Sequence, residues 1–274
     1  MSVALLCVSA GMTRQNYYKT RSLRERMQVD EDLILELIRR ERCRHPRLGA
    51  RKLRHVLAGE LKRAEVQIGR DGFFALLARH DLLIERRGRV ARTTDSWHGF
   101  GVYPNLAKDL ILAGSHQLLV SDITYIRTLE GFMFLSLVMD LFSRVIVGYD
   151  SSDSLEMEGA LRALSMAQKQ LPAASQTMHH SDRGSQYCCQ AYVAQLKERQ
   201  MTISMTEDNH CYENAHAERL NGILKQEYGL GETFAQKCQV SVAVKEAVNL
   251  YNHWRPHGAL GNRTPMEVHR GTSP

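Results

Sequence analysis

Apolar side chains in the first 80 residues recur at helical spacing. Leu33 and Ile34 are followed one turn later by Leu37 and Ile38, which predicts a helix with one apolar stripe. The helices are expected over a small pair within residues 2–19, around Leu33 to Ile38, from about Leu53 to Gly59, and from about Arg70 to His80. Basic side chains occupy the other faces. Two helices joined by a turn, with arginines around them, predict a helix-turn-helix DNA-binding region.

Four basic side chains around the last two helices are candidates for contacts with DNA phosphates. They are Arg51, Lys52, Arg54 and Arg70. Lysine and arginine side chains of this kind supply the salt-dependent part of DNA affinity. Helix pairs of this size are also common in proteins that do not bind DNA, so the pattern alone leaves simple helix packing as the alternative.

The pattern changes to apolar runs of strand length beyond residue 117. The expected order is three strands, then alternating helices and strands, then helices. Strands are expected at 117–126, 132–139, 144–149, 177–180 and 201–204, and helices at 155–170, 188–199, 214–228 and 234–254. This order predicts an α/β fold, in which helices cover the faces of a mixed sheet.

These patterns divide the chain into four parts. Residues 1–85 form the helical DNA-binding region, and the polar, arginine-rich start of 86–112 predicts a linker. Residues 113–230 form the α/β core, and residues 231–274 form a helix and tail that pack on it.

The charge distribution supports this division. The 274 residues carry 36 basic and 30 acidic side chains, for a net charge of +6. Residues 1–100 hold 21 basic and 12 acidic side chains, whereas the remainder is slightly acidic. The imbalance favours a front segment that grips phosphates and a domain that gathers cations, although a merely soluble basic surface is the alternative.

Cysteine usage and hydropathy indicate a reduced, cytoplasmic protein. The six cysteines form no C-x-x-C pair and no regular framework, so no disulfide is expected. The apolar start, Val3 to Val8, is too short to span a bilayer and has no basic residue before it, so neither a membrane helix nor a signal peptide is expected.

Three carboxylates in separate short motifs are the strongest candidates for chemistry. Asp122 interrupts an apolar strand, Asp182 follows a short strand just before Gly184, and Glu218 lies within a helix. Each acid alone is more simply explained as a turn cap or a surface charge. Together, they predict an all-oxygen site for two divalent cations, which is the chemistry of phosphodiester cleavage and transfer.

The helix that carries Glu218 has one polar face. Asn214, Glu218, Asn221 and Lys225 share it at near-helical spacing. Lys225, two turns beyond Glu218, is expected to hold a DNA phosphate beside the metal, and Asn214 is a further candidate for DNA contact.

Other polar residues near these motifs have competing explanations. His180 is expected either to support the metal ligands or to pack at the strand end, and Gly184 is expected to allow a tight turn beside Asp182. Zinc binding by His179, His180 and the pair Cys188–Cys189 is disfavoured because adjacent ligands reach one tetrahedral centre poorly.

Two further positions are open to a structural explanation. Asp140 is expected in a turn rather than at a metal. Trp254 and Arg255 fit either stacking and phosphate contact or capping of the domain.

Several segments together resemble the DDE transposases of bacterial insertion sequences. The likeness is greatest to the catalytic product of two-reading-frame elements, which are similar in turn to retroviral integrases. It implies a ribonuclease-H-like fold preceded by a small all-α helix-turn-helix region. The segments that carry the resemblance are 121–126, 180–187, 213–218, 224–227 and 251–257.

The resemblance also implies roles for the acids and a reaction. Asp122 is expected to bridge two Mg²⁺ ions, while Asp182 and Glu218 each complete one, with Mn²⁺ as a substitute ion. Cleavage at the element's ends frees a 3′-hydroxyl, which then attacks another phosphodiester. The implied partners are double-stranded DNA of the terminal repeats and the target, further copies of this chain on that DNA, and a product of an upstream reading frame.

Two other functions compete with transposition. One is a domesticated DNA-binding regulator whose core is only a scaffold, and the other is a ribonuclease-H-like nuclease that cuts without joining. All three acids and Lys225 are present, which argues against an inactive scaffold.

Overall fold

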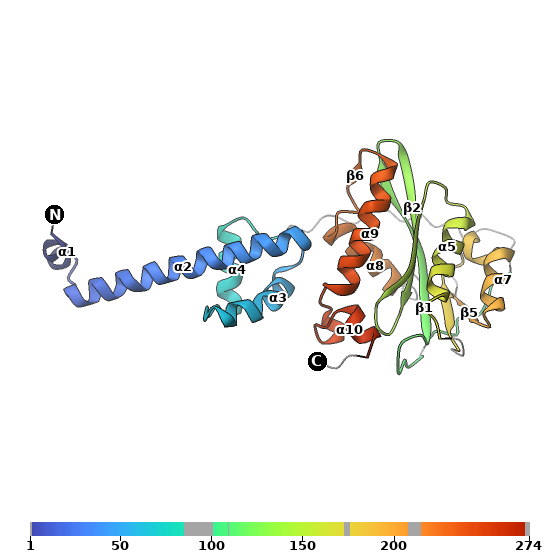
Figure 1. Cartoon of the computed structure of the whole chain (residues 1–274), viewed down its shortest axis with the longest axis horizontal. Coiled ribbons are helices and arrows are strands. Elements are labelled where there is room, and N and C mark those ends of the chain that lie inside the picture. The colour runs from blue at the N-terminus through green and yellow to red at the C-terminus, as the bar shows by residue number, and fades with distance from the viewer. Residues whose placement is uncertain (1, 85–100, 109, 173–175, 208–214, 272–274) are drawn as a thin grey trace. The chain divides into compact units, whose positions relative to one another are not determined.

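The computed structural model of the chain describes residues 2–84, 101–108, 110–172, 176–207 and 215–271. The chain divides into two compact units, residues 1–84 and residues 85–274 (Figure 1).

The first unit consists of four helices. They are α1 (Val3–Ser9), α2 (Arg14–Arg44), α3 (Ala50–Arg63) and α4 (Arg70–Arg79). Gly11, with φ of 62°, allows the chain to reverse between α1 and α2, and the Thr13 hydroxyl caps α2 by accepting a hydrogen bond from the Asn16 N–H. Ile38, Leu57 and Phe73 are fully buried where α2, α3 and α4 pack together.

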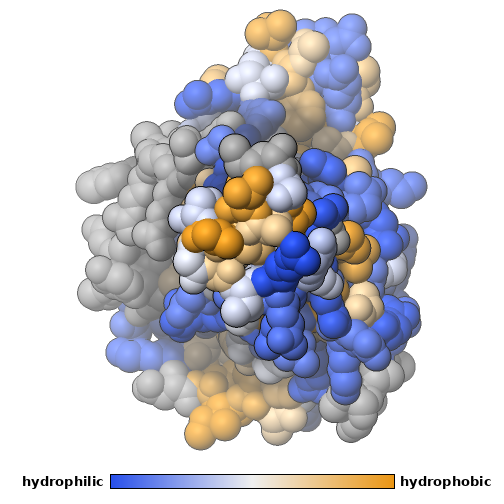
Figure 2. Space-filling model, turned by 90° about the vertical axis from the view of Figure 1, so that its left-hand side faces the viewer, coloured by the Kyte–Doolittle hydropathy of each residue, from blue (hydrophilic) through white to orange (hydrophobic). Residues whose placement is uncertain are grey.

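Helices α2 and α3 are longer than the sequence pattern predicts, whereas α4 lies where it was expected. Helix α2 runs unbroken for 31 residues, because residues 14–44 contain no glycine or proline to interrupt it. Helix α3 continues past Gly59, where the helix was expected to end, and buries Leu61 half a turn later. Figure 2 views the protein from the side on which α1 lies in Figure 1, and apolar and polar side chains are mixed on this surface. Leu5 and Val8 of α1 are among the exposed apolar side chains.

The second unit is built on a mixed sheet with the strand order β3-β2-β1-β4-β5. Strands β1 to β3 are antiparallel neighbours, β4 and β5 continue the sheet in parallel, and β6 pairs in parallel with the far end of β1. The strands are β1 (Leu118–Thr128), β2 (Gly131–Asp140), β3 (Ile146–Ser152), β4 (Met178–Ser181), β5 (Thr202–Met205) and β6 (Thr233–Phe234).

Helices cover both faces of this sheet (Figure 1). Leu118 and Val120 of β1 pack toward α8 and α9, whereas Leu119 packs toward α5 and α7, as the alternation of side chains along a strand requires. The mixed sheet with flanking helices confirms the expected α/β fold class. The helices are α5 (Met157–Gln168), α6 (Ser185–Cys188), α7 (Gln190–Glu198), α8 (Ala215–Glu227), α9 (Lys237–His253) and α10 (Pro265–His269), with a 3-10 turn η1 (Gly258–Leu260).

The second half of the expected linker lies on the sheet unit. The backbone N–H groups of Leu106 and Ala107 donate to the Ser204 hydroxyl, and the Met205 N–H donates to the Pro104 carbonyl. These contacts hold the chain against β5, so the linker predicted over 86–112 does not extend to its predicted end. Its first half, 86–100, lies outside the described residues.

Four short elements of this unit, α6, β6, η1 and α10, were not expected from the sequence. Strand β6 has two residues, and α10 has five, which are too few to show a hydrophobic period. In the described part of the chain, no helix combines the length and the apolar character that crossing a membrane requires.

Candidate active site

The register of two parallel strands brings Asp122 and Asp182 to the same level. Val120 of β1 lies opposite His180 of β4. Asp122 and Asp182 each follow two residues later, so both point to the face of the sheet that Val120 shares with α8. Asp182 comes directly after the last residue of β4, Ser181. The two acids therefore meet where β4 leaves the sheet.

Helix α8 supplies the third acid and a hydrogen bond to the first. The Asn221 side-chain N–H donates to Asp122 Oδ2 over 2.6 Å. Glu218 lies three residues earlier on α8, on the same face of the helix. The sequence pattern placed Asn221 on this polar face without giving it a role. Its contact with a residue 99 positions away depends on how α8 crosses the sheet, which helical spacing does not reveal.

Negative charge is concentrated around Asp122. Burial, together with the charges of Asp182 and Glu218, raises the pKa of this carboxyl to about 8. Hydrogen bonds from the Ile123 N–H and from Asn221 act in the opposite direction and only partly offset the increase. The ionised form of Asp122 is therefore unfavourable unless a cation compensates for it.

Asp182 is held by the turn that follows it. The Gly184 N–H donates to Asp182 Oδ1 over 3.0 Å. Gly184 has an ordinary φ of −62°, so the glycine is not required by its backbone conformation. A Cβ atom at this position would lie 3.0 Å from Asp182 Oδ1 and 3.2 Å from Gln186 Oε1. Glycine is therefore favoured here because the acid approaches the backbone closely.

His180 contacts the neighbouring strand. Its Nδ1 lies 2.9 Å from the Ser204 hydroxyl, which already accepts hydrogen bonds from Leu106 and Ala107. The Ser204 hydroxyl therefore donates a hydrogen bond to His180 Nδ1. Of the two roles expected for His180, this contact favours packing between β4, β5 and the segment before β1.

His179 points to the opposite face of the sheet and is neutral. Its Nε2 lies 2.8 Å from the Ser121 hydroxyl and 2.9 Å from the Tyr192 hydroxyl. Burial, with a smaller contribution from His180, lowers the pKa of His179 to about 3. The thiol of Cys188 lies 3.6 Å from the Met205 sulfur, so these contacts give no support to the zinc site considered from the sequence.

The three carboxylates do not form a closed metal cage as they stand. Among the residues that the structure describes, no group of three or more His, Cys, Asp or Glu side chains is placed so that it could hold a metal ion. Glu218 is exposed in the first turn of α8, and residues 208–214 just before that helix lie outside the described residues. With no cation between them, the like charges of the three carboxylates repel one another, which favours an arrangement that is too open to hold a metal ion.

Lys225 lies close to this group of acids. Its ammonium nitrogen is 4.4 Å from the centre of the Tyr125 ring. Burial lowers the pKa of Lys225, whereas the charge of Asp122 raises it and that of Arg127 lowers it further. The polar face of α8 thus brings Asn221 and Lys225 to β1, while Asn214 lies outside the described residues.

The basic residues expected to contact DNA differ in their surroundings within the first unit. Arg51 is exposed in the first turn of α3, and Lys52 beside it is half-buried. Arg54 donates to the Ile68 carbonyl over 3.5 Å, and Arg70 donates to Asp71 Oδ1 over 2.8 Å. Arg51 and Arg70 are therefore the exposed members of the four, and Lys52 and Arg54 are half-buried.

Asp140 has the turn role expected from the sequence. It is fully buried, and it accepts hydrogen bonds from the His116 N–H over 2.6 Å and from the Ser143 N–H and hydroxyl, each over 2.8 Å. Asp140 therefore stabilises the connection between β2 and β3, and these three hydrogen bonds engage both of its carboxylate oxygens.

Trp254 and Arg255 have different surroundings. Trp254 is 51% exposed at the end of α9. The buried Arg255 guanidinium donates to both carboxylate oxygens of Glu227, over 2.8 and 2.7 Å. Capping of the domain, rather than phosphate contact, is the role that these contacts favour for Arg255.

Comparisons with known proteins agree with this arrangement. Two family models, both described as integrase core domain, match residues 113–211 and 199–265. The transposase for insertion sequence element IS629 of Shigella sonnei is 30% identical over 98% of this chain and 91% of its own length. Transposase InsF for insertion sequence IS3A of Escherichia coli (strain K12) is 34% identical over 70% of this chain and 68% of its own.

A solved structure of the HTLV-2 integrase catalytic core domain, in complex with magnesium, covers 57% of this chain and 98% of its own, with 16% identity and a TM-score of 0.46. The sequence relatives agree with the resemblance drawn from the short motifs, and the integrase core models cover the whole span from before β1 to α10. The chain therefore belongs to the family of insertion-sequence transposases and carries an integrase core domain.

Proposed function

We propose that this chain cuts DNA strands at the ends of its mobile element and joins the freed ends to target DNA. The observation that carries the proposal is the buried Asp122 carboxyl, whose pKa is raised by burial and by the nearby charges of Asp182 and Glu218. An integrase core and relatives named as transposases support phosphodiester transfer as the reaction. Asp122, Asp182 and Glu218 are the proposed catalytic and metal-binding residues.

The donor set at this place fits a hard divalent cation. It offers carboxylate oxygens without a nearby thiolate or imidazole among the three proposed ligands, and magnesium prefers such ligands. Two Mg²⁺ ions, or Mn²⁺ in their place, would supply Lewis acidity and lower the pKa of the attacking group. The chain's own contribution is to orient the acids: Asn221 fixes Oδ2 of Asp122, and the Gly184 N–H fixes Oδ1 of Asp182.

Cation binding is expected to strengthen as the pH rises. In the metal-free protein, Asp122 keeps its proton up to a pH of about 8, so a cation must displace that proton at lower pH. We expect the affinity for Mg²⁺ to rise up to about tenfold per pH unit between pH 6 and pH 8, and then to level off. Thermal unfolding with increasing MgCl₂ at each pH measures this change. Equal Mg²⁺ affinity across that range would contradict the role given to Asp122.

A joining assay tests the reaction itself. Labelled DNA from the end of the element is incubated with the protein, Mg²⁺ and unlabelled target DNA. Transposition predicts labelled strands covalently joined to the target. A nuclease without joining activity would release only shortened labelled strands, and a DNA-binding regulator would leave the DNA intact, so each competing function has its own outcome.

We further propose that residues 1–84 bind the DNA ends of the element through α3. The double variant Arg51→Gln, Lys52→Gln removes two charges from the first turn of this helix. If both side chains contact phosphates, the slope of log affinity against log salt concentration should flatten by about 2, since each contact contributes about 0.9. Fluorescence anisotropy with labelled duplex DNA over a series of salt concentrations measures this slope.

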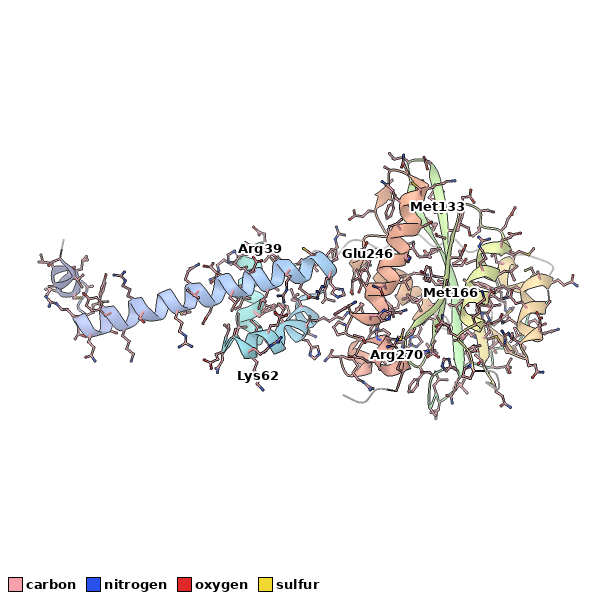
Figure 3. All side chains as sticks on the ribbon, in the orientation of Figure 1. Arg39, Lys62, Met133, Met166, Glu246 and Arg270 are labelled. Carbon is pink, nitrogen blue, oxygen red and sulfur yellow. The ribbon has the colours of Figure 1, made fainter. Side chains whose placement is uncertain are left out.

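The same helix offers a matched control. Lys62 and Arg63 are exposed at its other end, and the Lys62 side chain projects away from the helix (Figure 3). Lys62→Gln, Arg63→Gln removes the same charge from the same helix. An equal flattening by both variants would mean that the charge of the unit, rather than the first turn of α3, determines DNA affinity.

A mobile element has two ends, and both must be cut and joined, which suggests that several copies of the chain act on the DNA. We propose that at least two copies of this chain act together on DNA, in the cytoplasm and at the nucleoid. An upstream reading-frame product remains a proposed partner.

A further inference from the structure

Two aromatic rings form a pair on the β1–β2 hairpin, outside the hydrophobic core. The rings of Tyr125 and Phe132 meet edge to face, with their centres 5.5 Å apart and an angle of 86° between their planes. Phe132 is 52% exposed, and Tyr125 is half-buried. Neither side chain belongs to the buried clusters on the two faces of the sheet. The pair therefore presents aromatic surface to solvent.

The edge of β1 is open beside this pair. Strand β4 pairs with β1 only as far as Val120, and β6 pairs with it only from Arg127 onward. Between these points, within the part of the chain that the structure describes, residues 121–126 of β1 have no neighbouring strand on that side. Asp122 and Tyr125 both lie in this gap. A substrate strand that reaches Asp122 can therefore reach the aromatic pair without displacing a strand.

Positive charge surrounds the rings. The Lys225 ammonium lies 4.4 Å from the centre of the Tyr125 ring, and the exposed Arg127 is directly opposite Phe132 in the antiparallel register. Tyr125 follows Asp122 by three residues, which is about 10 Å along a strand. That distance corresponds to about three stacked nucleotides. The odd spacing turns the Tyr125 side chain to the opposite face of the sheet, so a DNA strand passes from Asp122 to Tyr125 around the open edge of β1. Aromatic faces flanked by cations suit nucleobases joined by phosphates, whereas a purely apolar partner would leave both charges unmatched.

We propose that Tyr125 and Phe132 form a stacking platform for an unpaired nucleobase of the DNA strand whose phosphodiester lies at Asp122. Lys225 and Arg127 hold the phosphates on either side of that base. The platform lets the end of a duplex open next to the acids, because stacking on the rings replaces the stacking that the base loses. This inference rests on the proposed function, and it adds a ligand, an unstacked base, and two residues that bind it.

The test compares two DNA duplexes that share one strand. One is fully paired, and the other has its last three base pairs mismatched so that the terminal bases are free. The wild-type full-length chain should bind the mismatched duplex about tenfold more tightly, as expected for the stacking of one or two bases. Tyr125→Leu should remove most of this preference and leave binding to the paired duplex unchanged, whereas Tyr125→Phe, which keeps the ring, should retain it.

Two controls make the result specific. Trp254→Leu removes an aromatic side chain that is equally exposed, at 51%, from the far end of α9, and it should keep the preference. An abasic nucleotide in place of the stacked base should weaken wild-type binding but not that of Tyr125→Leu. A preference that survives in both Tyr125→Leu and Phe132→Leu would overturn the platform.

The outcome is separable from that of the proposed function. If the wild-type chain cleaves and joins DNA but binds both duplexes equally, the platform alone is wrong. If no variant cleaves DNA and the wild type shows no Mg²⁺-dependent activity, the proposed function fails, whatever the stacking result.

Discussion

Asp122→Asn is expected to abolish strand cleavage and joining while making the metal-free protein more stable. The loss of activity should be on the order of a thousandfold or more, because the variant loses the carboxylate proposed to bind the catalytic cations. DNA binding by the intact chain should be unchanged, since asparagine has nearly the same shape and the first unit is untouched. Glu218→Gln is expected to lose cleavage in the same way.

The gain in stability follows from the direction of the pKa shift. The pKa of Asp122 is raised from 3.8 to about 8 by burial and by the neighbouring acids, so the folded chain holds a proton that the unfolded chain releases. Stability is therefore lost as the pH rises from about 4 to about 8. Asparagine does not ionise. At pH 8 without metal, the variant should be more stable by a few kcal/mol, or roughly 5–10 °C in Tm.

Thermal unfolding at pH 5 and pH 8, with and without MgCl₂, measures both effects. The variant should gain most over the wild type at pH 8 without metal, and addition of Mg²⁺ should narrow the difference because only the wild type binds the ion. Glu198→Gln is the matched control, since it removes an exposed carboxylate from α7. Mg²⁺-dependent cleavage by Asp122→Asn, or a lower Tm at pH 8, would refute the assignment.

The sequence predicted most strands and helices of the second unit well because the spacing of their apolar residues is regular. The strand with Asp122, the short strand before Asp182 and the helix with Glu218 lie where the pattern placed them. Strand alternation and helical spacing are local properties, and each of these segments is long enough, or flanked clearly enough, to show them. The short motifs around the acids then indicated the family.

What the sequence did not predict depends on pairing between distant segments. Spacing put Asn221 on the polar face of α8, but its bond to Asp122 depends on the crossing of α8 over β1. The gap along β1 beside Tyr125 arises because β4 ends early and β6 begins late, and β6 itself has only two residues. The pairing register of distant strands and the exact ends of such short strands do not produce a repeating pattern of apolar residues in the sequence.

Arg255→Met is expected to destabilise the second unit, residues 85–274, strongly without altering its chemistry. The Arg255 side chain is 4% exposed and forms a two-fold hydrogen-bonded ion pair with Glu227, the last residue of α8. Methionine fills much of the volume but leaves the Glu227 carboxylate, itself 19% exposed, without its cation. Loss of one partner of such a pair costs about 3–5 kcal/mol, or on the order of 10 °C in Tm for a unit of this size.

A double-mutant cycle separates the ion pair from simple loss of packing. Glu227→Gln removes the charge that Arg255→Met leaves behind, so the double variant should recover about half of the lost stability or more. Cleavage measured well below the lowered Tm should stay within a fewfold of wild type and keep the same pH dependence, because neither residue touches the three acids. If Arg255→Met instead keeps the wild-type Tm but weakens DNA binding, Arg255 acts on phosphate, and the alternative role considered from the sequence is the correct one.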